Sequence, residues 1–110
     1  MNSNEVIVIP EDRQLIVRRI ISVLNSGPKL EILKILSEGK PLTASELAEK
    51  LKVKISTVLS HLEDLTNAGL VKVETESIGG RVIKKYSLIS NKIVLTVNIH
   101  ALTHIEEVGV

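Results

Sequence analysis

The chain has 110 residues, of which 44% are hydrophobic and 25% charged, and its formal net charge is +1, so it can bury one modest core as a single domain. It has no cysteine, which excludes disulfide bonds and thiolate metal sites. No apolar run reaches the roughly 18 residues of a membrane span, and we expect a cytoplasmic protein. With no Phe or Trp and only one tyrosine, Tyr86, it lacks the side chains on which single-stranded bases stack.

An N-terminal strand and helix are predicted first. Residues 6–9 are an apolar, β-branched run that Pro10 stops, which is typical of an edge strand. A helix starts at Glu11 or Asp12, where acidic side chains complement the helix dipole, and continues to Leu24. Its apolar residues cover more than one stripe, and a chain this short has no large core to enclose them. The pattern therefore predicts a dimer interface on this helix.

The next two helices begin at recognisable caps. Ser26 precedes Pro28, a residue favoured in the first helical turn, which predicts a helix start at this point. Thr43 or Ser45 caps the following helix, and Glu46 stands at the capping-box spacing from Thr43. Both starts are therefore predicted from local hydrogen bonding alone.

A fourth helix runs from about residue 55 to residue 68, after a tight turn in which Val53 is expected to be buried. Gly69 suits the left-handed position that closes a helix. Leu59 is expected in the core, although an exposed Leu59 could touch thymine methyl groups. The predicted buried side consists of Ile55, Val58, Leu59, Leu62 and Leu65. Two helices joined by so short a turn are a helix-turn-helix, whose second helix enters a DNA major groove.

The chain after Gly69 changes to strand periodicity. Residues 70–74 alternate, residues 77–80 are predicted as a hairpin turn because the paired glycines supply positive φ, and residues 81–88 return. Residues 92–100 alternate again and predict a third strand, with a helix as the second choice. This strand could pair with residues 6–9, in the same subunit or in a partner.

Four motifs in these elements are typical of one protein family. They are GPKLEIL at residues 27–33, ELA at 46–48, STVLSHL at 56–62 and AGLV at 68–71. With them, residues 26–89 resemble a winged helix-turn-helix transcriptional regulator of the ArsR type, without the cysteine metal site. Two positions depart from the family pattern. Lys54 stands where serine usually caps the recognition helix, and Leu59 occupies a usually polar position.

The predicted fold is α+β and mainly α: a winged helix-turn-helix with a two-stranded wing and an additional C-terminal strand, dimerising through the N-terminal helix. Residues 1–10 would form a tail with an edge strand, and residues 11–90 the DNA-binding domain. Residues 91–110 would form a C-terminal strand and tail that contribute to dimerisation.

Candidate DNA contacts gather at the turn before the recognition helix, on that helix and on the wing. Lysines there would bind phosphates, short hydroxyl side chains would approach base edges, and the wing arginine would enter the minor groove. His61 is either a DNA contact or a structural histidine. The candidates are Lys50, Lys52, Lys54, Ser56, Thr57, Ser60, His61, Arg81 and Lys84.

These features predict a homodimeric regulator of transcription that binds double-stranded DNA sequence-specifically, with the recognition helix in the major groove and the wing at the minor groove. The alternative is a winged-helix module that binds another protein and not DNA, which the acidic Glu63 and Asp64 favour. No nucleophilic cysteine, glycine-rich phosphate loop or paired carboxylate motif is present, so we expect no enzyme activity.

His100 and His104 are the one pattern that suggests a metal. On a helix, this spacing could place two imidazoles on one ion, with Glu106 and Glu107 close behind. The residues before His100 are predicted as strand, however, and thiolates are absent. We therefore expect no metal site, no cofactor and no effector that the sequence identifies.

Overall fold

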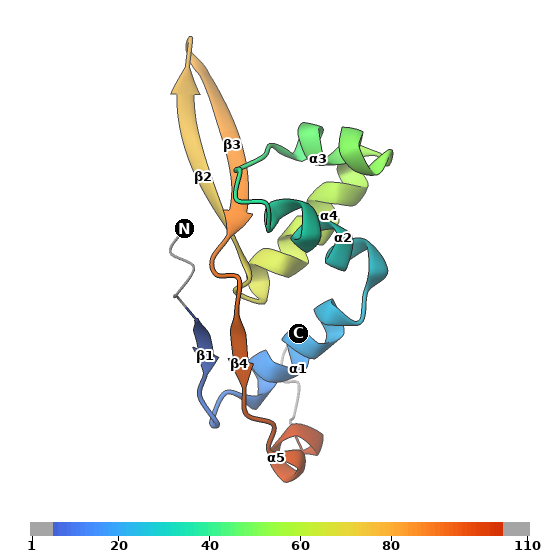
Figure 1. The fold of residues 1–110 in the computed structure, drawn as a ribbon, viewed down its shortest axis with the longest axis vertical. Coiled ribbons are helices and arrows are strands. Elements are labelled where there is room, and N and C mark those ends of the chain that lie inside the picture. The colour runs from blue at the N-terminus through green and yellow to red at the C-terminus, as the bar shows by residue number, and fades with distance from the viewer. Residues whose placement is uncertain (1–5, 105–110) are drawn as a thin grey trace.

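The computed structural model, which describes residues 6–104, has a winged helix-turn-helix at one end and a small parallel sheet at the other (Figure 1). No helix within this range is long and apolar enough to cross a membrane. The elements in chain order are β1 (Ile7–Ile9), α1 (Gln14–Leu24), α2 (Gly27–Leu36), α3 (Ala44–Leu51), α4 (Ile55–Asn67), β2 (Val71–Ile78), β3 (Arg81–Leu88), β4 (Ile93–Leu95) and α5 (Ile99–Thr103). The predicted α+β winged helix-turn-helix with a two-stranded wing and an additional C-terminal strand is confirmed.

The start of α3 is held by a complete capping box. The Thr43 hydroxyl accepts a hydrogen bond from the Glu46 N–H at 3.1 Å, and the Glu46 carboxylate accepts one from the Thr43 N–H at 3.0 Å. Thr43, not Ser45, is therefore the cap. At the other end of α3, Lys52 adopts a left-handed conformation with a φ of 58°, which turns the chain sharply into α4.

The capping box makes part of the stability dependent on pH. The pKa of Glu46 lies below its ordinary value of 4.5, first because the Thr43 N–H bonds its carboxylate. The Thr43 side chain and the charges of Lys40 and Lys85 lower this pKa further, while burial opposes them. A depressed carboxylate pKa stabilises the fold above the unfolded-state pKa, and this stabilisation is lost as pH falls through the folded-state pKa.

We therefore expect the Glu46→Gln variant, which keeps a side-chain acceptor but has no titrating carboxyl, to differ most from the wild type at neutral pH. Urea unfolding at pH 7 and at successively lower pH measures this difference. The difference in the free energy of unfolding between the wild type and Glu46→Gln should narrow as pH falls below 4.5. A gap that stays constant down to acid pH would contradict the role given to the Glu46 charge.

The core forms where α4 crosses α2 and α3. The side chains of Val58, Leu62 and Leu65 on α4 are buried completely or almost completely, and they pack with Ile32 and Leu47 from α2 and α3. This core is aliphatic, as the composition requires. It leaves the opposite side of α4, which carries serines, free for solvent.

Three aliphatic residues that the sequence placed in the core are exposed instead. Val53, Ile55 and Leu59 are 44%, 46% and 45% exposed, so their predicted burial was wrong. Val58 and Leu62 already fill the contact with α2 and α3. Leu59 projects from the flank of α4, where only a shallow groove separates it from the hairpin. Val53 and Ile55 lie in the turn and the first helical turn, at the edge of the core.

The β2–β3 hairpin forms the wing and is longer than the sequence indicated. Its register pairs Val71 with Leu88 at the base and Ile78 with Arg81 at the tip. Gly79 and Gly80 both have positive φ, so the predicted glycine turn is confirmed. The outgoing strand continues four residues beyond position 74, so Ser77 and Ile78 belong to the strand and not to the turn. Reciprocal backbone hydrogen bonds between Leu42 and Tyr86 anchor the wing to the segment that enters α3.

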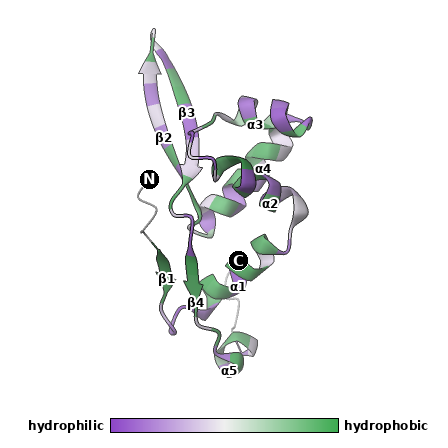
Figure 2. Cartoon of the chain, in the orientation of Figure 1, coloured by the Kyte–Doolittle hydropathy of each residue, from purple (hydrophilic) through white to green (hydrophobic). Residues whose placement is uncertain are grey.

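The N-terminal and C-terminal strands pair with each other in the same chain. β1 and β4 are parallel, and the Ile7 N–H donates to the Lys92 carbonyl at 2.8 Å. The predicted pairing is therefore confirmed, but the strand predicted for residues 92–100 ends at Leu95. α5 begins at Ile99 because the Asn98 side chain caps it, accepting from the Ala101 N–H at 2.9 Å. Figure 2 shows both β1 and β4 as almost wholly hydrophobic.

A buried glutamine connects α1 to this terminal sheet. The Gln14 side chain donates to the carbonyl of Thr96 at 2.9 Å and accepts from the N–H of Asn98 at 3.2 Å. It also donates to the Glu11 carbonyl, and α1 starts at Gln14 rather than at Glu11 or Asp12. The residues between β1 and α1 form a turn instead, closed by the Arg13 N–H bonding the Pro10 carbonyl.

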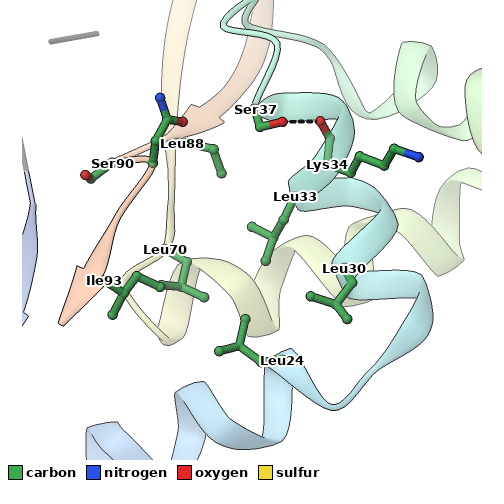
Figure 3. Close-up of a pocket in the computed structure, with 10 residues that line it drawn as sticks. Leu24, Leu30, Leu33, Lys34, Ser37, Leu70, Leu88, Ser90 and Ile93 are labelled. Atoms are coloured by element: carbon green, nitrogen blue, oxygen red, sulfur yellow. Dashed lines mark hydrogen bonds between the residues drawn. The ribbon is translucent and has the colours of Figure 1, made fainter. Parts of the chain in front are cut away.

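An open apolar groove of about 430 Å³ separates α1, α2 and the start of β4 (Figure 3). Leu24 lines it from α1, Leu33 from α2 and Ile93 from β4. Leu15 and Ile21, also on α1, are exposed outside this groove. The described part of the chain therefore leaves several apolar side chains of α1 uncovered.

Candidate nucleic-acid interface

The turn between α3 and α4 concentrates positive charge at the start of the recognition helix. Lys50 lies in the last turn of α3, Lys52 is its left-handed C-cap, and Lys54 is the N-cap of α4. All three side chains are exposed. The Lys54 side chain makes no capping hydrogen bond, as expected where serine is replaced. Free N–H groups and the helix dipole add to the lysine charges, which together favour a phosphate.

The polar candidates on α4 do not all share one face. Ser56 and Ser60 are exposed on the side opposite the buried stripe. Thr57 lies about 100° further around the helix from Ser56, on the flank of Asp64. On that flank the Asp64 carboxylate binds the Lys29 ammonium of α2 at 2.9 Å, whereas Thr57, two turns earlier, is exposed to solvent. His61 is half-buried at the edge of the core. The solvent-facing start of α4 therefore presents Ser56 and Ser60 on one side and Thr57 on a neighbouring flank.

The wing carries the remaining two candidates. Arg81 directly follows the turn at the wing tip and is exposed. Lys84 is also exposed, but alternation along a strand places its side chain on the face opposite that of Arg81. Lys85 is paired with Glu76 at 3.7 Å, which offsets part of the local positive charge. Figure 1 shows the wing and α3 projecting at the same end of the molecule.

Sequence reasoning did not place exposed aliphatic side chains in this region. Val53, Ile55 and Leu59 now join the lysines and serines there. The spacing of apolar residues on α4 already indicated which of them would remain outside the core. Val58, Leu62 and Leu65 already form an i, i+4, i+7 stripe, which is as wide as one helix contact requires.

The two C-terminal histidines lie at the far end of the molecule. His100 and His104 stack with ring centroids 4.2 Å apart, and the His104 Nδ1 lies 2.8 Å from the His100 carbonyl oxygen. Stacked rings do not direct two nitrogens at one ion. Glu106 and Glu107 lie outside the described residues. Within residues 6–104, no group of three His, Asp or Glu side chains is arranged to hold a metal ion.

The helices that carry this interface match a known family model. Residues 26–73 match the model described as bacterial regulatory protein, arsR family. The helix-turn-helix of this chain therefore resembles that of the ArsR family. The match covers α2, α3, α4 and the start of the wing, so it includes the basic turn and the whole recognition helix. The family that this model describes consists of bacterial regulatory proteins, as the sequence resemblance indicated.

Solved structures share the same winged helix-turn-helix. The ArsR-like transcriptional regulator from Rhodococcus sp. RHA1 is 26% identical, with a TM-score of 0.57 over 71% of this chain and 67% of that one. Stf76 from the Sulfolobus islandicus plasmid-virus pSSVx is 26% identical, with a TM-score of 0.53 over 59% and 84%. Reduced HlyU from Vibrio cholerae N16961 has 24% identity and a TM-score of 0.60 over 73% and 79%, which shows the fold alone. No curated protein sequence matches the chain.

Proposed function

We propose that the chain acts in the cytoplasm as a homodimeric regulator of transcription that binds double-stranded DNA sequence-specifically. α4 would enter the major groove, and the wing would lie at the minor groove. The observation that carries this proposal is the uncovered first turn of an ArsR-type α4, with exposed Lys52 and Lys54 before it and Ser56 and Ser60 on it.

The charge distribution supports a small number of phosphate contacts. The lysines at the α3–α4 turn form one group and Arg81 at the wing tip forms a second, while the net charge of the whole chain is only +1. Phosphate contacts fix the position of a protein on DNA, and base contacts specify sequence. The affinity for DNA should therefore depend on salt, with a slope set by these two groups.

The uncovered apolar surface of α1 supports the dimer. Leu15, Ile21 and Leu24 are exposed on one short helix, and Leu24 also lines the groove beside α2. A second copy is the occupant we propose, since a two-fold interface buries the same surface twice. Such a dimer would present two α4 helices and prefer pseudo-palindromic DNA with half-sites about one helical turn apart.

Fluorescence anisotropy with a labelled generic duplex across a salt series tests DNA binding. We expect the affinity to fall with salt, and Lys54→Ala and Arg81→Ala each to reduce the magnitude of the log–log slope by about one, because each removes one phosphate contact. Lys92→Ala is the matched control, because Lys92 is also exposed but lies beside the terminal sheet. Its slope should equal that of the wild type.

The outcomes separate this proposal from its alternative. An absence of binding at low salt would contradict DNA binding and favour a protein-binding winged helix. Binding whose salt slope is unchanged in both the Lys54 and Arg81 variants would mean that another surface contacts the DNA.

A further inference from the structure

Two exposed aliphatic side chains lie beside the serines on the recognition helix. Ile55 and Leu59 are four residues apart, so they are neighbours on one side of α4. Each is nearly half exposed, although the helix forms its core contact through other residues. Leu59 also lines a groove of about 170 Å³ with Val73 and Tyr86 of the wing. Leu59 therefore lies on the flank of α4 between the serines and the wing, and Ile55 lies one turn before it on the same flank.

The first two turns of α4 lack the side chains that usually recognise bases by paired hydrogen bonds. Residues 55–62 contain no Arg, Lys, Asn or Gln, the residues that bond guanine or adenine bidentately. Ser56 and Ser60 bond many base edges and discriminate little between them. An apolar contact is also available in the major groove, where thymine alone presents a methyl group.

We propose that Ile55 and Leu59 determine sequence specificity by contacting thymine C5-methyl groups in the major groove. This inference rests on the proposed DNA-binding function and adds the base that is recognised. Residues i and i+4 on a helix have Cβ atoms about 6 Å apart, which is roughly two base-pair steps of 3.4 Å. Each half-site therefore contains two preferred thymines, one for Ile55 and one for Leu59, separated by about two steps.

Deoxyuridine tests this contact because it pairs like thymidine and lacks only the methyl group. A random-core duplex pool is first enriched on the wild-type protein, and an enriched duplex is then prepared with single thymine-to-uracil replacements. Anisotropy gives the Kd of each duplex for the wild type, Ile55→Ala and Leu59→Ala. Val94→Ala is the matched control, an equally exposed aliphatic residue on β4 in the terminal sheet.

For the wild type, we expect uracil at each of two positions to weaken binding about fourfold, the effect of removing one buried methyl group. Leu59→Ala should abolish the loss at one position and Ile55→Ala the loss at the other, while Val94→Ala retains both. Equal binding of thymine and uracil duplexes by the wild type overturns the inference, and so does a methyl effect that persists in both variants. Failure to bind any duplex overturns the proposed function itself.

Discussion

Replacing Leu62 with alanine is expected to lower the free energy of unfolding by about 2–5 kcal/mol, because the change leaves a cavity at the α2–α3–α4 crossing. Leu62 is 1% exposed and packs among fully buried side chains. A domain of this size is stable by only about 5–15 kcal/mol, so the loss removes a large share of its stability. Urea unfolding followed by far-UV circular dichroism measures it.

Leu59→Ala is the matched control for this change, since both leucines lie on α4 and lose the same atoms. Leu59 is partly exposed, and alanine is the better helix former, so we expect a change within about 0.5 kcal/mol. Equal losses at the two positions would mean that Leu59 is buried against the wing in solution. That outcome would also remove the basis for its contact with thymine.

The second large effect concerns the proposed dimer. We expect Ile21→Glu, which places a charge on the uncovered surface of α1, to convert a dimer at about micromolar concentration into a monomer. Loss of the second half-site contact should then weaken binding to an enriched palindromic duplex on the order of a hundredfold. Light scattering gives the oligomeric state, and anisotropy gives the affinity.

Ile78→Glu controls for the added charge, because Ile78 is exposed at the tip of the wing, far from α1. This variant should remain dimeric. A wild-type protein that is monomeric at micromolar concentration would contradict the dimer altogether. A dimer that persists in the Ile21 variant would place the interface on another surface.

Features determined by local chemistry could be predicted from the sequence. The Thr43 cap needs only the Glu46 side chain three residues later, and both residues bond as the spacing indicates. The turn at the wing tip likewise depends only on the positive φ of its two glycines. The family motifs span α2 to β2, and the family model matches the same region. The helix-turn-helix and its basic turn were therefore predictable.

Features determined by distant contacts could not be predicted. The helical spacing indicates that Leu59 lies beside the buried stripe, but how far it is exposed depends on how much of α4 the wing covers. The end of β4 and the start of α1 both depend on Gln14, whose side chain bonds Thr96 and Asn98 more than eighty residues away. Candidate site residues were identifiable by type and position, and the 100° step of a helix already separates Thr57 from Ser56.

The pairing of β1 with β4 has a consequence for the order of folding during synthesis. A ribosome makes residues 7–9 early, but their partners at positions 93–95 appear only after the whole winged helix-turn-helix. The helices around Leu47 and Leu62 contact one another over short sequence separations and can assemble first. The nascent chain must therefore carry the exposed, apolar β1 segment until β4 emerges. During that interval, β1 is the segment most open to a chaperone or to pairing with another nascent chain.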